Sequence, residues 1–305
     1  MTTLHDRIIG AVLASALGDA FGAPYEGGLM ERLLWIILGR RQGKRRWTDD
    51  TRMSVDVMES LLACQGVDQN DLARRFACSY RWTRGYGPGA AKVLKRIRQG
   101  ESWQNANRAV YPEGSFGNGG AMRAAPVGLF YGAAYQRQLV RAVRETTVVT
   151  HAHPAGQDGA VIIALTAALL CSEYSVRDIF KRLRLHVQTE KFHNKMMPAE
   201  RFLNAEDSVT PQQAARELGN GIKATESCVT ALFIGLALRD TAFSDLLAYV
   251  RKVGGDTDTI GAMAGAIWGA ACGYGQVPEK FLQQLEQRRY LEELARRLAD
   301  RPDVF

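Results

Sequence analysis

The sequence is poor in cysteine and proline and has no strong excess of one charge. Its five cysteines are an odd number without CxxC spacing and lie in apolar stretches, which excludes a disulfide framework and argues against a zinc site. Charged residues are 23% of the chain and hydrophobic residues 46%, a balance that excludes intrinsic disorder. Only 9 prolines interrupt the 305 residues, and no linker divides them. We therefore expect one compact domain over residues 1–305.

Long hydrophobic runs are also scarce. The most apolar stretches, 160–171 and 261–273, are about a dozen residues each, short of the roughly 20 that cross a bilayer. The N-terminal apolar run imitates a signal peptide, but it contains Gly10 and continues in helical register. A net charge of +7 permits an anionic ligand or a nucleic acid without requiring one. We expect a cytoplasmic monomer without membrane contact.

What the sequence does contain is helical periodicity. Helix-start signals are present where Ser175 precedes Asp178 by three residues, and where Thr210 precedes Pro211 and Gln213. Alternating strand patterns are almost absent, and the polar stretch 190–210 is interpreted as a surface loop. We predict an all-α fold of about a dozen orthogonally packed helices. Beyond the first helix, around residues 9–20, they cover 53–64, 70–82, 89–99, 120–132, 136–149, 156–172, 176–188, 211–222, 225–239, 244–253, 260–274 and 278–299.

Two short acidic segments stand out, Thr48-Asp49-Asp50-Thr51 and Asp256-Thr257-Asp258-Thr259. Each precedes a helical pattern, so capping of a helix N-terminus is one explanation. Together they supply more carboxylates than capping uses, and four carboxylates in one pocket would repel one another unless cations lie between them. An all-oxygen set suits Mg²⁺ or Mn²⁺ rather than zinc or copper. The segments therefore favour a two-metal centre, with capping as the alternative.

A glycine-rich segment, Gly114-Ser115-Phe116-Gly117-Asn118-Gly119-Gly120, leads into an apolar helical stretch. Glycines let backbone N–H groups approach a ligand closely, and a helix N-terminus behind them favours a diphosphate. The segment is not a Walker A sequence, because no GK[ST] follows, and a packing loop is the alternative. Its aromatic residue, Phe116, would either stack on a base or ribose or fill the core.

Three further candidates each have a plain structural explanation. The loop Arg84-Gly85-Tyr86-Gly87 is typical of a helix end followed by a turn. His151 is more often a cap or a core partner than a ligand, and Glu26 is an ordinary solvated carboxylate unless the fold places it at the metals.

A basic run precedes the first acidic segment. A solvated loop is the usual explanation for such a run, and guidance of a polyanionic substrate toward the metals is the functional one. The run consists of Arg40, Arg41, Lys44, Arg45 and Arg46.

As a set, these segments resemble the ADP-ribosylglycohydrolases over nearly the whole chain. The resemblance rests on six blocks in a fixed order: Gly18-Asp19-Ala20 with Glu26, Thr48 to Thr51, Arg84 to Gly87, Gly117 to Arg123, Thr150-His151 and Gly254 to Thr259. It implies an all-α fold around two Mg²⁺ ions, with Mn²⁺ as a substitute. It also implies hydrolysis at the anomeric carbon of the distal ribose of ADP-ribose, with an ADP-ribosylated protein or another acceptor as partner.

The resemblance assigns roles by matching motif positions. The implied metal ligands are Thr48, Asp49, Asp50, Asp256, Asp258 and Thr259. The implied catalytic residues are Glu26, Asp256 and Asp258. The implied substrate-binding residues are Tyr86, Ser115, Phe116, Gly117, Asn118, Gly119, Gly120, Met122 and His151.

Within the family, Tyr25-Glu26 after the first helix resembles the branch that removes ADP-ribose from serine and other O-linked acceptors. The stretch between Glu26 and Thr48 departs from that branch in being shorter and basic. Three alternatives stay open: an arginine-directed hydrolase, a dimetal nucleotide phosphoesterase and a catalytically silent, crystallin-like member. The intact carboxylates argue against the last.

Overall fold

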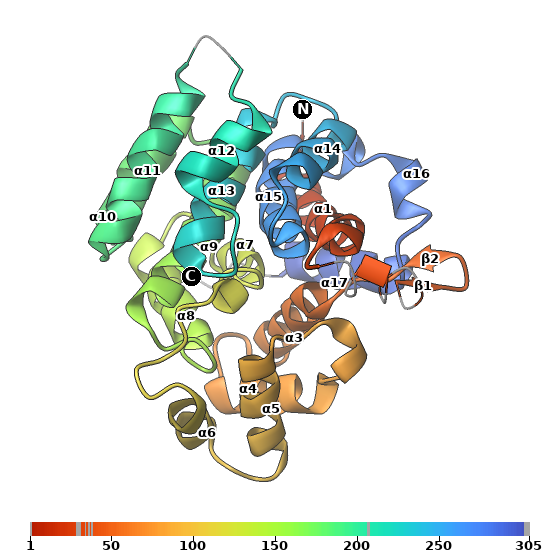
Figure 1. Cartoon of the computed structure of the whole chain (residues 1–305), viewed down its shortest axis with the longest axis vertical. Coiled ribbons are helices and arrows are strands. Elements are labelled where there is room, and N and C mark those ends of the chain that lie inside the picture. Colours follow the sequence, from red (N-terminus) through yellow and green to blue (C-terminus); the bar gives the residue numbers. More distant parts are fainter. Residues whose placement is uncertain are drawn as a thin grey trace.

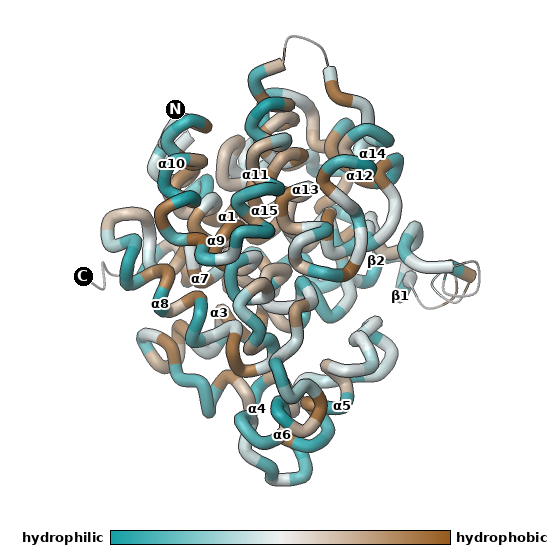
Figure 2. The backbone as a smooth tube through the Cα atoms, turned by 60° about the vertical axis from the view of Figure 1, so that its left-hand side comes forward, coloured by the Kyte–Doolittle hydropathy of each residue, from teal (hydrophilic) through white to brown (hydrophobic). Residues whose placement is uncertain are grey.

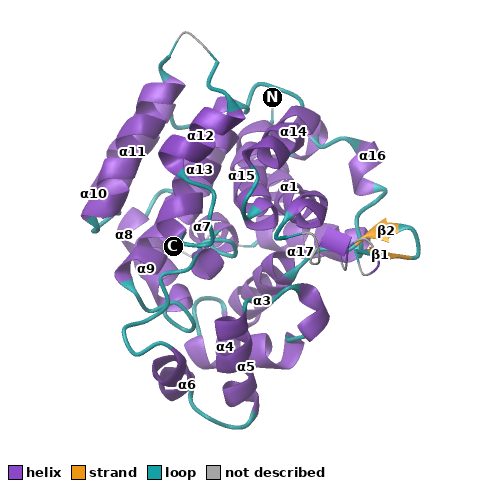
Figure 3. Ribbon diagram, in the orientation of Figure 1, coloured by secondary structure: helices purple, strands orange, loops and turns teal. Residues whose placement is uncertain are grey.

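The structure is a computed structural model that describes residues 2–28, 32, 33, 35, 37, 39–205 and 208–301. Figure 3 shows that helices dominate this part of the chain, with one small hairpin at its edge. The elements are α1 (Leu4–Gly22), β1 (Arg40–Arg41), β2 (Lys44–Arg45), α3 (Asp49–Cys64), α4 (Gln69–Ser79), α5 (Pro88–Arg98), α6 (Trp103–Val110), α7 (Ala125–Tyr131), α8 (Gln136–Thr147), α9 (Pro154–Cys171), α10 (Val176–His186), α11 (Glu190–Leu203), α12 (Pro211–Leu218), α13 (Ala224–Ala237), α14 (Phe243–Val253), α15 (Thr257–Cys272), α16 (Glu279–Leu282) and α17 (Arg288–Ala299). The predicted all-α class is confirmed.

Helix starts follow the predicted capping chemistry. The Thr210 hydroxyl accepts a hydrogen bond from the Gln213 N–H at 3.2 Å, with Pro211 in the first turn of α12. The Ser175 hydroxyl accepts from the Asp178 N–H at 3.1 Å and so caps α10. These side chains satisfy backbone donors that have no partner inside the helix.

Two sequence-based interpretations of secondary structure were wrong. The polar stretch after residue 190 is not a loop throughout, because residues 190–203 form α11, whose buried face carries Phe192, Met196 and Phe202. The basic run is not simply a solvated loop, because β1 and β2 pair antiparallel with Arg40 opposite Arg45. A third difference is smaller: the helix expected over 278–299 is split into α16 and α17, with Gln287 at a left-handed φ of 53° between them.

The core is centred on α1, α9, α13 and α15, which pack against one another (Figure 1). Figure 2 shows hydrophilic positions on the outer turns of peripheral helices such as α4 and α6. The N-terminal helix α1 and the late helix α15 lie side by side, and α17 also packs on α1. The first and last parts of the described chain therefore belong to the same body.

Close contact between α1 and α15 depends on glycine. A Cβ added at Gly18 would overlap the carbonyl of Gly261, and one added at Gly265 would overlap the carbonyl of Ala14. Only hydrogen side chains let the two backbones approach this closely. The contact places the C-terminal end of α1 beside the N-terminal end of α15, where the hydroxyl of Thr257 donates to the carbonyl of Gly22 at 3.0 Å.

Two described segments are longer and more apolar than we predicted from the sequence. Leu4–Tyr25 and Pro154–Cys171 have the length and composition of a membrane span, so the expectation that no segment reaches that length was wrong. However, 78% of the first window and 89% of the second are buried inside the fold. Their apolarity is therefore accounted for by the core that they form.

Candidate functional site

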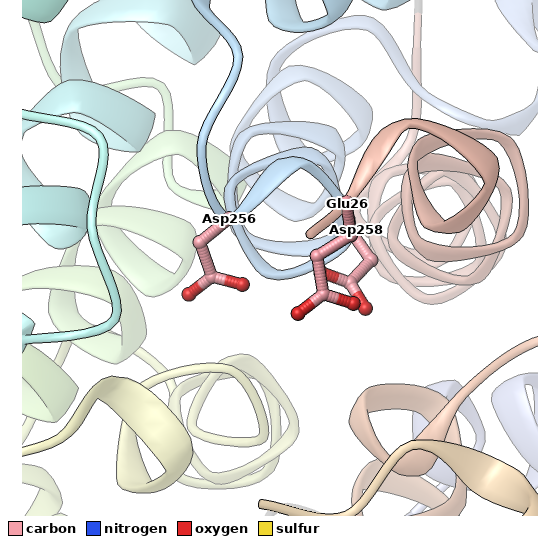
Figure 4. Close-up of side chains that lie close together, drawn as sticks. All are labelled: Glu26, Asp256 and Asp258. Atoms are coloured by element: carbon pink, nitrogen blue, oxygen red, sulfur yellow. The ribbon is translucent and has the colours of Figure 1, made fainter. Parts of the chain in front are cut away.

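Three carboxylates meet where the end of α1 approaches the start of α15. Ligand oxygens of Glu26, Asp256 and Asp258 all lie within 4.8 Å of one another. Figure 4 shows their carboxylates pointing to the same side of the α15 N-terminus, with Glu26 beside Asp258. Asp256 and Asp258 are buried and Glu26 is half-buried. The segment after the first helix and the second acidic segment thus contribute to one site.

The first acidic segment is held by a buried carboxylate of α1. Asp19 accepts from the backbone N–H of Thr48 at 2.9 Å, from the N–H of Thr51 at 3.0 Å and from the Thr51 hydroxyl at 2.5 Å. The Thr48 hydroxyl in turn donates to Asp50 at 3.0 Å. Asp19 therefore fixes the start of α3 in place, although it was given no role from the sequence.

Carboxylates of the two acidic segments raise one another's pKa values. Burial raises the pKa of Asp49 well above its ordinary value, and the charges of Glu26 and Asp256 add to the effect. Burial likewise raises the pKa of Asp50 and Asp258, and each is raised further by a carboxylate of the opposite segment. Segments about 200 residues apart in sequence interact in this way only if the fold brings them together.

Helix capping explains part of this arrangement. Thr48 caps α3, because its hydroxyl accepts from the Asp50 N–H at 3.2 Å. Asp256 is the N-cap residue of α15 but makes no capping hydrogen bond with its side chain. The capping alternative therefore holds for one threonine and leaves the four aspartates unexplained.

A divalent cation fits this donor set. The side chains of the predicted ligand set offer only carboxylate and hydroxyl oxygens, as hard ions prefer. The Oδ1 atom of Asp50 is buried without a hydrogen-bond partner in the described part of the chain, and such an oxygen is costly unless something binds it. The remaining threonine of the predicted set, Thr259, is also buried at the start of α15, where its N–H donates to Asp258 at 2.8 Å.

The glycine-rich loop is tied to the same site by Asn118. Its side-chain amide donates to Asp256 at 2.5 Å and to the hydroxyl of Ser227 at 3.0 Å. The loop backbone is anchored as well, because the Asn118 N–H donates to the carbonyl of Ile222 at 3.0 Å. The loop is therefore a fixed wall of the site rather than a free surface turn.

Aromatic and small residues of the loop lie in different environments. Phe116 is 51% exposed and touches His153 edge-to-face with centroids 5.9 Å apart, so it does not fill the core. Ser115, Gly120 and Met122 are buried. An exposed ring on a rigid loop is available to a ligand, whereas the buried residues support the loop from behind.

His151 lies beneath the glycine loop and is neutral. Burial lowers its pKa to about 3, with the charge of Arg123 adding to the effect. The Thr150 hydroxyl is 2.8 Å from His151 Nδ1 and accepts from Arg123 at 2.7 Å. The Thr150 hydroxyl therefore links the buried guanidinium of Arg123 to the His151 ring. The ring contacts the loop, since a Cβ on Gly119 would come within 2.7 Å of Cε1.

The loop around Tyr86 forms another side of the site. Arg84 pairs with Glu286 at 2.7 Å and lies over the ring of Trp47 at 3.8 Å, and Gly85 follows with a left-handed φ of 91°. The expected helix end and turn are therefore present. Tyr86 is buried against the ring of Tyr80, and its predicted contact with substrate stays a prediction.

Comparison with known proteins decides the family. A family model described as ADP-ribosylglycohydrolase matches residues 1–304. The chain belongs to this family. A solved structure described as an ADP-ribosylglycohydrolase-related protein complex aligns with a TM-score of 0.65 and 25% identity, over 98% of this chain and 99% of that chain.

Curated relatives of this ADP-ribosylglycohydrolase include enzymes from distant organisms. ADP-ribosylhydrolase ARH3 of Homo sapiens is 33% identical, over 96% of this chain and 92% of its own length. The ARH3 of Danio rerio is 32% identical over 96% of this chain and 90% of its own. The ADP-ribosyl-[dinitrogen reductase] glycohydrolase of Rhodospirillum rubrum is 26% identical over 94% and 92%. The chain is accordingly a glycosidic-bond hydrolase that acts on ADP-ribosylated substrates.

Asp19 and Arg123 belong to the motif blocks of this ADP-ribosylglycohydrolase, but no role was predicted for either from the sequence. Asp19 interrupts an otherwise apolar helix face, and a buried acid at such a position indicates that donors converge on it. Arg123 is fully buried, donates to the carbonyl of Gly119 at 2.7 Å and lies over the ring of Phe76 at 4.6 Å. The first signal is readable from sequence, whereas the second requires the fold.

Proposed function

We propose that this chain removes ADP-ribose from an O-linked acceptor such as serine, using two Mg²⁺ ions at the carboxylate cluster. One observation carries the proposal: oxygens of Glu26, Asp256 and Asp258 lie within 4.8 Å of one another. ARH3 proteins of several vertebrates support an O-linked acceptor, because they are about one-third identical over most of the chain.

In this proposal the ions are held by the predicted oxygen ligands, which are Thr48, Asp49, Asp50, Asp256, Asp258 and Thr259. Divalent ions held there would supply Lewis-acid chemistry at a ribose diol and the reacting centre. Asn118 keeps Asp256 in its ligand orientation through the 2.5 Å hydrogen bond. Asp19 does the same for Thr48 through the backbone N–H. The chain's own contribution is thus a prearranged set of anionic oxygens.

Glu26 is proposed to move the proton. Hydrolysis adds hydroxide from water to the anomeric carbon and a proton to the departing acceptor oxygen, and a carboxylate beside the scissile bond can carry that proton. Glu26 is half-buried and lies beside Asp258, so its charge is disfavoured by its neighbours as long as no cation is bound. Developing positive charge on the sugar is stabilised by the same carboxylates.

The glycine loop is proposed to hold the rest of ADP-ribose. The backbone of Gly117 to Gly120 would take the diphosphate, with the ring of His151 behind it. The exposed ring of Phe116 would cover the adenine or ribose, while Ser115, Met122 and Tyr86 would complete the wall. The loop suits this task because Asn118 couples it directly to Asp256.

Two rival activities are distinguishable. A nucleotide phosphoesterase needs cations aimed at the transferring phosphoryl group, and no described ion pair joins an arginine or lysine to the four aspartates. An arginine-directed hydrolase would share the metal site. We also propose that residues 1–305 act as a single domain, in accord with the packing of both α15 and α17 on α1. A cytoplasmic monomer is likewise proposed.

The decisive experiment is a product assay with the purified chain and Mg²⁺. The substrates are serine-, arginine-, glutamate- and nucleic-acid-linked ADP-ribose. We expect free ADP-ribose from the serine conjugate, inactivation by EDTA, and recovery with Mg²⁺ or Mn²⁺. Release of AMP or phosphate would favour the phosphoesterase, and turnover of the arginine conjugate alone would overturn the O-linked assignment.

A further inference from the structure

The basic hairpin β1–β2 is docked on the segment that joins α16 to α17. The Arg45 N–H donates to the carbonyl of Gln284 at 2.6 Å, and the Glu286 N–H donates to the carbonyl of Arg45 at 3.0 Å. The Lys44 ammonium donates to the carbonyl of Gln283, and the Arg45 guanidinium lies over the ring of Phe21 at 4.1 Å. The hairpin is thus a built part of the surface.

A groove of about 730 Å³ opens between this hairpin, the start of α3 and the start of α17. Four cationic side chains line it, Lys44, Arg52, Arg288 and Arg289, together with the amides of Gln283 and Gln287. No acidic side chain is among the described lining residues. A concave surface with one sign of charge concentrates ligands of the opposite sign.

Carboxylates outside the groove pair with two of its four cations. Arg52 lies 2.6 Å from Asp56 and 3.9 Å from Glu59, and Arg288 lies 2.5 Å from Glu279 and 2.7 Å from Glu292. Arg289 and Lys44 are exposed and make no ion pair with the described part of the chain. The ammonium of Lys44 and the guanidinium of Arg289 therefore remain available to the oxygens of a bound anion.

The groove adjoins the first acidic segment, at the start of α3. Lys44 lies four residues before Thr48, which limits their separation to about 14 Å even in an extended chain. Arg52 lies four residues after Thr48, roughly one turn along α3, or about 6 Å. Trp47 connects the two regions, because its indole N–H donates to the carbonyl of Glu286 at 3.2 Å.

We propose that this groove binds the phosphate backbone of a single-stranded nucleic acid, without reading its sequence. Guanidinium, ammonium and amide donors suit phosphate oxygens. The Tyr290 hydroxyl is bonded to Glu59, so this aromatic is not presented for base stacking. An acidic peptide is favoured less, because Arg45 of β2 already uses its N–H and carbonyl on residues 284 and 286, leaving no free edge there for a peptide strand.

Binding is separable from turnover, so this inference does not depend on the proposed function. The test measures fluorescence anisotropy of labelled dT20 and U20 with the full chain in EDTA, at 50 to 200 mM NaCl. The variant carries Lys44→Glu and Arg289→Glu. We expect its affinity to fall about 10- to 100-fold at 50 mM salt, and its salt slope to fall by about two. Both oligonucleotides should respond alike, since the 2′-hydroxyl is not read.

A matched control carries Arg177→Glu and Lys181→Glu on α10, which make the same change in net charge. Both residues are exposed, and α10 lies on the opposite side of the molecule from the hairpin in Figure 1. We expect less than about a threefold effect from this pair. Circular dichroism and thermal melting should show all three proteins equally folded, and release of ADP-ribose from a small conjugate should be unchanged by the groove pair.

Three results would overturn the proposal. The first is no binding of either oligonucleotide by the unaltered chain at 50 mM salt. The second is an equal loss in both double variants, which would mean that net charge alone acts. The third is groove-dependent binding of a glutamate-rich peptide as tight as that of dT20, which would assign the groove to acidic proteins instead.

Discussion

The site has two halves, which are the acidic segments at the starts of α3 and α15. The two halves have nearly the same four residues, yet they are held very differently. At the start of α3, Asp19 accepts three hydrogen bonds from Thr48 and Thr51, and Thr48 also caps the helix. At the start of α15, Asp256 is held by the amide of Asn118 from a loop and makes no capping bond. The first half is therefore braced by the core, whereas the second half is held by the glycine-rich loop.

This contrast indicates a division of labour. A braced half keeps its oxygens in place before any ion or substrate arrives, which lowers the cost of binding. The second half bonds to the glycine-rich loop and lies beside Glu26. We expect its carboxylates to shift when a ligand binds, and we call it the responsive half. The following variants are designed to break or sharpen this distinction, in order of decreasing effect.

The largest effect is expected from Asp258→Asn or Asp256→Asn in the responsive half. Each variant removes one charged ligand, and the loss of metal assistance should lower kcat by about a thousandfold or more. Far-UV circular dichroism should show unchanged helical content, because burial already disfavours the charged form of both residues. Full activity in either variant would remove the metal mechanism.

Glu26→Gln should separate chemistry from binding. The amide keeps the size of the side chain but cannot exchange a proton, so we expect kcat to fall by about 100-fold or more. The dissociation constant for ADP-ribose, measured by calorimetry, should change much less. If instead binding weakens as much as turnover slows, Glu26 acts by holding the sugar.

Asp19→Asn tests the braced half. Its amide nitrogen would face the N–H of Thr48 or Thr51, so the start of α3 should loosen and Mg²⁺ affinity should fall about 10- to 100-fold. Asp56→Asn is a matched control, because Asp56 is also a buried acid but bonds to Arg52 and Ser79 instead of the acidic segments. Calorimetric titration with Mg²⁺ should distinguish them, and equal affinities in both variants would contradict a bracing role.

The smallest effect concerns pH. Burial raises the pKa of Asp19 to about 6 from an ordinary 3.8, so its neutral form stabilises the metal-free fold below about pH 4 and that stability is lost as pH rises through 6. The raised pKa values of Asp49, Asp50 and Asp258 act in the same direction. The rise in Tm caused by Mg²⁺ should therefore be larger at pH 7.5 than at pH 5. A rise independent of pH would show that the carboxylates are not neutralised together.

The sequence predicts the juxtaposition of the two acidic segments because two near-identical sets of carboxylates need a shared counter-ion. It also predicts most helices, because the apolar spacing and the caps at Ser175 and Thr210 act locally. Its failure at α11 has a physical reason: Pro198 and many charges hide a regular buried face, and burial of Phe192 and Phe202 outweighs the cost of proline inside the helix.

Other features could not be read from the sequence because they depend on tertiary contacts. The hydrogen bonds of Asp19 join residues about 30 positions apart, and the pairing of Arg45 with residues 284 and 286 joins opposite ends of the chain. A basic run contains no information about the segment on which it docks. Periodicity and capping depend on the sequence of a single element, whereas these contacts depend on how two elements pack together.

The glycine contact between α1 and α15 also sets the order in which the catalytic centre can be completed during synthesis. A nascent chain grows from its N-terminus and folds as it emerges, yet Asp256 and Asp258 follow more than four-fifths of the residues. Until Gly261 reaches Gly18, a ribosome-bound chain carries half of the carboxylates and no complete cage for a cation. We therefore expect no turnover from a chain in which α15 has not yet packed on α1.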